Sequence, residues 1–177
     1  MNAPDSIEPL VCKAAELLRE QHRTLATVES CTGGMVGAAL TALAGISDVY
    51  LGGFVTYSNM AKQITVGVSP QTLAKHGAVS GQVAREMAGG GRRKLLATHA
   101  LAITGIAGPD GGTEDKPVGT VWICVEGCAQ IECRRFVFPG DRASVRTLAT
   151  FAALSMLIQQ ITGRYEELDH QHERSEA

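Results

Sequence analysis

The sequence predicts an α/β protein, a three-layer α/β/α sandwich in which helices cover both faces of a mixed β-sheet. Short apolar segments of strand length alternate with segments of helical periodicity as far as residue 104, an order typical of parallel strands joined by helices. Two strand-like segments then follow each other through the turn Glu126-Gly127, which indicates an antiparallel hairpin. The chain has 177 residues, 45% of them apolar, enough for a single domain with a buried core.

The individual elements are assigned from hydrophobic periodicity and from capping residues. Ser58 or Asn59, Ser80 and Asp141 stand where helices should begin, because their side chains can accept hydrogen bonds from the first free N–H groups of a helix. We expect residues 1–162 to form the domain and the charged residues 163–177 to be a frayed tail. In chain order, the expected elements are helix 6–21, strand 24–29, helix 33–43, strand 49–57, helix 59–66, helix 81–96, strand 99–104, strands 118–125 and 131–138, and a last helix from Asp141 to Ile161.

Glycines interrupt two of these elements. Gly52 and Gly53 lie inside a predicted strand, where they indicate a β-bulge or a close backbone contact. Gly89, Gly90 and Gly91 lie inside a predicted helix. Because each glycine costs up to ~1 kcal/mol relative to alanine in a helix interior, we expect that helix to be weak or kinked at this point.

Composition excludes several classes of protein. The formal net charge of −2 argues against non-specific nucleic-acid binding, which requires a net basic surface. The longest apolar run, residues 35–46, is too short to span a membrane, and the N-terminus lacks the features of a signal peptide. The five cysteines are odd in number and include no C-x-x-C pair, so neither a disulfide framework nor a zinc site is indicated. We therefore expect a cytoplasmic protein that binds no metal.

The segment ESCTGG, residues 29–34, places reactive side chains between a strand and a helix. Ligands gather beyond the carboxyl ends of strands in open α/β sheets, and a helix N-terminus offers free N–H groups and a partial positive charge. Ser30 is therefore a candidate nucleophile, with the turn stabilising a developing oxyanion. An equally good interpretation is a plain N-cap by Ser30 or Thr32. Cys31 is a weaker candidate nucleophile, since a thiolate would also gain from the helix N-terminus.

The segment YSNMAK, residues 57–62, offers a base for that serine. A serine hydroxyl needs a proton acceptor before it can attack. Lys62 can accept the proton if burial keeps its amine neutral, and its position in the first turn of a short helix also disfavours its charge. Tyr57, at the end of the strand, could relay the proton. On spacing alone, a solvent-exposed amine is the more common role for such a lysine.

Two further segments could contact a ligand. The glycine-rich loop 104–119 is long for a compact domain, and its N–H groups could line a carbonyl oxygen or a phosphate. Its acidic residues suggest either a divalent ion or simple solvation. In FPGDR, residues 138–142, Arg142 lies in the first turn of the last helix, where a cation is unfavourable unless an anion is bound nearby. A bound phosphate would explain this arginine, and so would a side chain that points into water.

Six segments in this order resemble the CinA C-terminal domain family, which comprises the nicotinamide-nucleotide amidohydrolases, or NMN deamidases. They are ESCTGG, GGFVTYSNMAK, HGAVS, TGIAGPDGG, KPVGTV and FPGDR, and the resemblance covers residues 8–162. It implies an α/β/α fold, often a homodimer, and hydrolysis of the carboxamide of nicotinamide mononucleotide (NMN) to nicotinic acid mononucleotide and ammonia, a step of pyridine nucleotide salvage in NAD metabolism. It also implies a free-standing deamidase, since the N-terminal domain of full CinA proteins is absent.

The resemblance also implies roles for individual residues. Ser30 corresponds to the proposed nucleophile, and Tyr57 and Lys62 correspond to the residues proposed to activate it. No cofactor is implied. The implied substrate contacts come from the two glycine turns, the start of the short helix and, for the phosphate, the last helix: Thr32, Gly33, Gly34, Asn59, Thr104, Gly105, Ala107, Gly108 and Arg142.

The sequence departs from the family pattern in two places. Asp110 stands where a glycine usually follows Gly-Pro, and the three glycines at 89–91 replace a more helical stretch. Neither departure touches the proposed nucleophile or base.

A second hypothesis is a catalytically inactive module that binds pyridine nucleotides through the same glycine turns and Arg142. Release of ammonia from NMN distinguishes the two.

Overall fold

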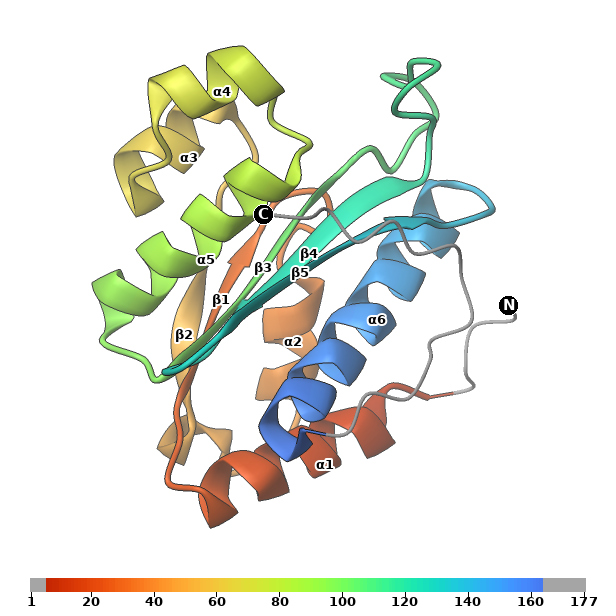
Figure 1. Ribbon diagram of the computed structural model, residues 1–177. Helices are drawn as coiled ribbons and strands as arrows, with labels where there is room; N and C mark the ends of the chain where they lie inside the picture. Colours follow the sequence, from red (N-terminus) through yellow and green to blue (C-terminus); the bar gives the residue numbers. More distant parts are fainter. Residues whose placement is uncertain (1–5, 164–177) are drawn as a thin grey trace.

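A five-stranded mixed sheet forms the centre of the molecule in the computed structural model, which describes residues 6–163 (Figure 1). The strand order is β2-β1-β3-β4-β5; β1 is parallel to β2 and β3, and β4 is antiparallel to β3 and β5. Residues 164–177, which make up most of the predicted tail, lie outside the described residues. The strands are β1 (Leu25–Glu29), β2 (Tyr50–Val55), β3 (His99–Gly105), β4 (Thr120–Glu126) and β5 (Ile131–Val137).

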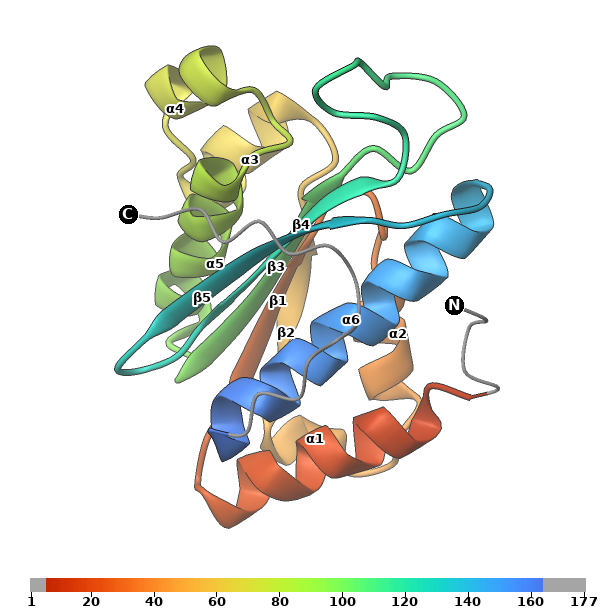
Figure 2. The same ribbon diagram turned by 45° about the vertical axis from the view of Figure 1, so that its right-hand side comes forward.

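Helices cover both faces of this sheet, as the turned view makes clear (Figure 2). Each face has its own apolar core: Leu25 of β1 packs with the helices on one side, and Val28 of the same strand packs with those on the other. The predicted three-layer α/β/α sandwich is therefore confirmed. One layer contains α1 (Glu8–Glu20), α2 (Met35–Thr41) and α6 (Arg142–Thr162), and the other contains α3 (Asn59–Val66), α4 (Pro70–His76) and α5 (Gly81–Leu95), while a short 3-10 turn, η1 (Ile46–Asp48), precedes β2.

Helix α4 was not predicted from the sequence, although its start carries a clear signal. Ser69 accepts hydrogen bonds from the N–H groups of Gln71 and Thr72, and Pro70 occupies the first helical position. Serine followed by proline is typical of a helix N-terminus. The predicted caps Ser58, Ser80 and Asp141 are confirmed, because each side chain accepts a hydrogen bond from an N–H group in the first turn of its helix.

Helix α5 is continuous from Gly81 to Leu95, so the kink expected at its three glycines is absent. All three glycines are buried. A Cβ atom at Gly90 would overlap the carbonyl oxygen of Val66, and one at Gly91 would overlap the side chain of Val28. At positions 90 and 91, the neighbouring atoms therefore lie too close for any side chain.

The pair Gly52-Gly53 combines both features that the sequence suggested. The β1–β2 register shifts between Leu25 and Ala26, which is a bulge in β2. A Cβ atom at Gly53 would overlap the hydroxyl oxygen of Thr27, so the two strands also make a close contact. Both interpretations are confirmed.

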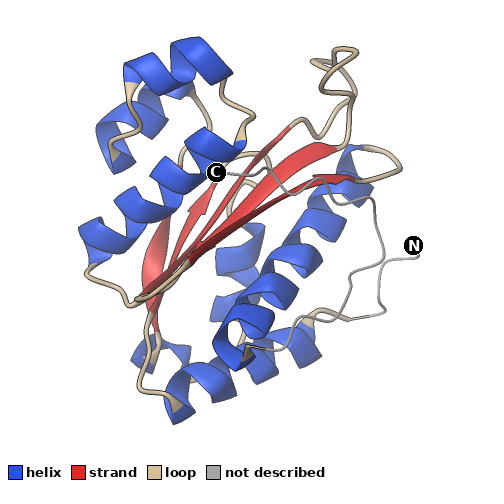
Figure 3. Ribbon diagram, viewed as in Figure 1, coloured by secondary structure: helices blue, strands red, loops and turns tan. Residues whose placement is uncertain are grey.

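The carboxyl ends of β1, β2 and β3 lie together at one end of the sheet. This end lies between the α3–α4 pair and the long loop at residues 106–119 (Figure 3). Parallel strands bring their carboxyl ends together, so the segments after β1, β2 and β3 become neighbours in space. Those segments contain most of the residues that the sequence singled out.

None of the helices within residues 6–163 is long and apolar enough to cross a membrane.

Candidate active site

Ser30 and Lys62 are in direct contact at the carboxyl end of β1. Lys62 Nζ donates hydrogen bonds to Ser30 Oγ at 2.9 Å and to the carbonyl oxygen of Thr56 at 2.7 Å. Lys62 is 1% exposed and Ser30 7% exposed. The interpretation of Lys62 as a solvent-exposed amine is therefore wrong. The predicted nucleophile and base lie at the distance that proton transfer requires.

The environment of Lys62 favours its neutral form. Burial lowers the pKa of its amine from the usual 10.5, and the nearby Cys31 side chain offsets part of this change. Both hydrogen-bond acceptors, a hydroxyl and a backbone carbonyl, are uncharged, so neither repays the cost of burying an ammonium ion. The Ser58 hydroxyl caps α3 by accepting the Ala61 N–H at 3.0 Å, which fixes the start of the helix that carries Lys62.

Glu29 occupies the N-terminus of α2. Its carboxylate accepts hydrogen bonds from the N–H groups of Gly34 at 3.0 Å, Val36 at 3.2 Å and Gly37 at 2.9 Å. The expectation that this helix end is free to stabilise an oxyanion is therefore wrong, because a protein carboxylate already takes up its donors. This role was not predicted from the sequence, although an acidic residue that ends a buried strand just before a helix is a signal for it.

The turn itself also differs from the expectation. Gly33 and Gly34 have positive φ angles of 62° and 97°, so they form a left-handed turn and α2 begins only at Met35. Neither Ser30 nor Thr32 caps the helix, and that alternative is wrong as well. Because Glu29 makes the capping contacts, the Ser30 hydroxyl is left to interact with Lys62.

Arg146 ties this turn to α6. Its guanidinium donates to the carbonyl oxygens of Cys31 at 3.1 Å and Thr32 at 2.9 Å. These bonds join segments that are more than one hundred residues apart in the chain, and Arg146 was not among the residues predicted from the sequence. Its spacing of four residues from Arg142, which puts both on one side of a helix, is the signal that could have found it.

Arg142 and Tyr57 form a second contact near the site. Arg142 donates from Nη1 to the Gly108 carbonyl oxygen at 2.8 Å and from Nη2 to the Tyr57 hydroxyl at 2.9 Å. Tyr57 is 60% exposed. The hydroxyl of Tyr57 thus contacts Arg142, whereas the side chain in contact with the Ser30 hydroxyl is Lys62. Arg142 does not simply point into water, because it links α6, the end of β2 and the long loop.

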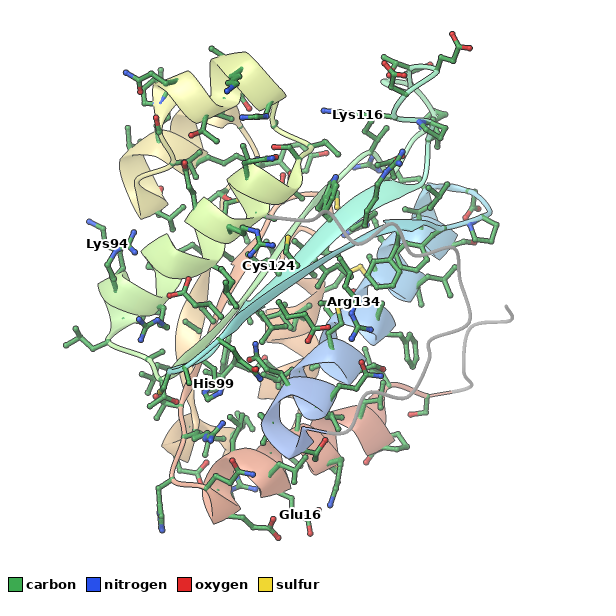
Figure 4. All side chains as sticks on the ribbon, in the orientation of Figure 1. Glu16, Lys94, His99, Lys116, Cys124 and Arg134 are labelled. Carbon is green, nitrogen blue, oxygen red and sulfur yellow. The ribbon has the colours of Figure 1, made fainter. Side chains whose placement is uncertain are left out.

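The long loop is held to its surroundings by several side chains. Thr104, just before it, donates to the Ala78 carbonyl oxygen at 2.8 Å, and Lys116 donates to the His76 carbonyl oxygen at 2.9 Å. Lys116 extends from the loop toward the end of α4 (Figure 4). Ala107 is buried, and Gly105 is packed so closely against β4 that an added Cβ would lie 2.8 Å from the Thr120 carbonyl oxygen.

The remaining predicted residues have distinct surroundings. Thr32 is fully buried, and among residues 6–163 its hydroxyl has no hydrogen-bond partner. Asn59 is exposed at the first position of α3.

Burial raises the pKa of the Cys31 thiol to about 11, so this thiol stays protonated near neutral pH and is a poor nucleophile. Within the described part of the chain, no group of three His, Cys, Asp or Glu side chains could hold a metal ion.

Comparison with known proteins decides the family. Residues 7–161 match the CinA C-terminal domain. The chain belongs to this family. It is 48% identical over 153 residues to the nicotinamide-nucleotide amidohydrolase PncC of Escherichia coli K12, an alignment that covers 84% of this chain and 90% of that protein.

Other members of the CinA family agree in sequence and in fold. A CinA-like protein of Geobacter sp. M21 is 52% identical over 145 residues, and the alignment covers 82% of this chain but only 35% of that protein. The chain therefore spans little more than a third of the length of several CinA-like relatives. The crystal structure of a CinA superfamily protein from Klebsiella pneumoniae 700603 has a TM-score of 0.86 at 38% identity, covering 90% of this chain and 99% of that one.

Proposed function

We propose that this protein hydrolyses the carboxamide of nicotinamide mononucleotide to nicotinic acid mononucleotide and ammonia. The observation that carries the proposal is the 2.9 Å hydrogen bond between the buried amine of Lys62 and the hydroxyl of Ser30. A buried lysine beside a serine can supply the base that amide hydrolysis needs. The similarity to the E. coli nicotinamide-nucleotide amidohydrolase PncC supports this choice of substrate.

In the proposed reaction, neutral Lys62 accepts the proton of Ser30 as the serine oxygen attacks the amide carbonyl. The carbonyl oxygen of Thr56, 2.7 Å from Lys62 Nζ, stabilises the lysine ammonium that forms. This ammonium then gives its proton to the amide nitrogen, which leaves as ammonia while the acyl–serine ester forms. Water hydrolyses the ester with Lys62 again acting as base, so the enzyme returns to its starting state.

The other predicted residues would bind and orient the substrate. Because Glu29 takes up the N–H groups at the start of α2, we assign the oxyanion to N–H groups of the long loop at Ala107 and Gly108. Arg142 is the candidate partner of the phosphate, and the contact of Tyr57 with it makes Tyr57 a substrate-binding residue rather than a proton relay. The scheme needs no metal or other cofactor.

We further propose a cytoplasmic homodimer. Exposed apolar side chains favour association with another protein surface, above all next to an unpaired edge strand. β2 is such an edge strand. The test is size-exclusion chromatography with light scattering, which measures the mass of the assembly directly. Exposed large apolar side chains lie on β2, on the segment after it and on α3: Leu51, Val55, Tyr57, Met60 and Ile64.

The test of the reaction is release of ammonia from NMN by the natural chain, Ser30→Ala and Lys62→Ala. Both variants should lose nearly all turnover, and Lys94→Ala, which removes an exposed lysine of α5, should keep it. Near-natural turnover in Ser30→Ala would exclude the acyl–serine route and leave direct attack by water with Ser30 only as a positioning group. Turnover that EDTA abolishes would indicate a metal-bound water instead. Binding of NMN without release of ammonia would support the inactive nucleotide-binding module.

A further inference from the structure

The three consecutive glycines of α5 touch different parts of the molecule. Gly91 packs against Val28 of β1, two residues before Ser30, and Gly90 packs against the carbonyl oxygen of Val66 at the end of α3. Val66 follows Lys62 by four residues, about one helical turn. Neighbouring residues of one helix therefore contact both elements that carry the serine–lysine pair.

We propose that Gly90 and Gly91 are positioning residues that set the separation between Lys62 and Ser30. Helices that carry side chains at their contact pack with axes about 8–10 Å apart, and glycine allows a closer approach. A side chain at Gly90 has no room beside the Val66 backbone, so it would displace α3 from α5. A side chain at Gly91 would press on β1 at Val28.

Displacement of α3 would change the chemistry of Lys62 as well as its position. Burial lowers the pKa of the amine, and with α3 in its present place the nitrogen contacts Ser30 Oγ and the Thr56 carbonyl oxygen. Outward movement of the helix would lengthen the bond to Ser30 and admit water to the amine. The lysine would then hold its proton at higher pH and act less often as a base.

Gly90→Ala tests the proposal, with Gly89→Ala as the matched control. Both variants add one methyl group to the same buried stretch of α5. At Gly89 the new Cβ would meet only side-chain ends that can move, Glu126 Oε2 at 2.9 Å and Arg93 Nη1 at 3.0 Å. We expect Gly90→Ala to lower kcat/KM for NMN on the order of 10-fold to 100-fold and to move the acidic limb of its pH profile to higher pH, and Gly89→Ala to change neither.

The kinetic readout rests on the proposed function, so a second readout is independent of any substrate. The pKa of the Lys62 amine can be followed by NMR of ¹⁵N-labelled lysine, with the resonance assigned by its absence in Lys62→Met. We expect this pKa to rise in Gly90→Ala and to stay at its natural value in Gly89→Ala. If the natural chain releases no ammonia from NMN, the proposed reaction fails, while the NMR comparison still decides the role of Gly90.

A purely structural role for Gly90 makes the opposite prediction. It would lower the melting temperature of Gly90→Ala while leaving the Lys62 pKa and the acidic limb unchanged in the folded protein, and that result would overturn the proposal. If Gly90→Ala does not fold, Val66→Ala removes packing between the same two helices from the α3 side, since the Val66 side chain belongs to the core shared with α5. It should move the Lys62 pKa in the same direction, and an unchanged pKa would again overturn the proposal.

Discussion

Each end of the sheet buries one nitrogen base, but only one of them is placed to react. Lys62 contacts Ser30 at the carboxyl end of the parallel strands. His99 lies at the start of β3, at the opposite end (Figure 4). Each side chain is 1% exposed. Burial lowers the pKa of both, in the case of His99 to about 4, because burial disfavours the charged form of each side chain.

The two bases differ in their hydrogen-bond partners. The Thr98 hydroxyl donates to the Thr24 carbonyl oxygen at 2.9 Å, so it accepts from His99 Nδ1 at 3.0 Å, and His99 Nε2 accepts from Arg23 Nη1 at 3.1 Å. Both ring nitrogens are therefore used in structural bonds, and the guanidinium of Arg23 opposes protonation. Lys62 instead contacts a serine hydroxyl that can give up its proton. Burial favours the neutral form of a base, and the hydrogen-bond partner of that base decides whether it can take part in a reaction.

The largest expected effect comes from removal of the base at the carboxyl end. Lys62→Met should lower kcat/KM for NMN on the order of 10⁴-fold, since general-base assistance contributes up to that much. The same variant should melt at a higher temperature at pH 7, because burying an ammonium ion opposes folding below its unfolded pKa of 10.5. The control variant Lys94→Met, which changes an exposed lysine, should have the same activity as the natural chain. Substantial turnover in Lys62→Met would show that Lys62 is not the base.

Glu29→Gln should cause the next largest loss, because it disturbs the turn that holds Ser30. The amide places its NH2 group where one of the two carboxylate oxygens now accepts, from Gly34 on one side or from Gly37 on the other, so a backbone donor loses its partner. We expect a free energy of unfolding lower by about 1–3 kcal/mol, measured in urea, and kcat/KM lower on the order of 10²-fold. Glu16→Gln, which alters an exposed pair with Lys13, is the control. Equal effects in both variants would contradict the capping role.

The pH dependence of stability tests the opposite end of the sheet. The pKa of His99 is about 4 in the folded protein against 6.5 unfolded, so its contribution to stability is present above pH 6.5 and is lost as the pH falls toward 4. The loss amounts to roughly 3 kcal/mol. His99→Gln keeps an acceptor for Arg23 and should show a correspondingly smaller drop over this range in urea unfolding at several pH values. Parallel pH curves for the two proteins would refute the assignment.

The smallest effect is expected at the buried thiol beside the serine. Because the pKa of Cys31 is raised to about 11, little thiolate exists at pH 7 and the thiol should be a bystander. Cys31→Ser should keep turnover within a few-fold of the natural chain in the NMN assay. Complete loss of ammonia release in a folded Cys31→Ser protein would instead identify the thiol as nucleophile and leave Lys62 as its base.

By itself, the sequence determined the order of the strands and of every α-helix except α4, three of the helix caps and the choice of Ser30 and Lys62 as a candidate pair. These depend on periodicity and on contacts within a few residues, which can be read locally. Only the tertiary structure decided that Lys62 is buried against Ser30, 32 residues away in the chain. It also decided that Glu29, rather than a hydroxyl, caps α2 and that the glycines of α5 mark close packing instead of a kink. Burial and packing arise from segments that meet only when the chain folds, so no local pattern reveals them.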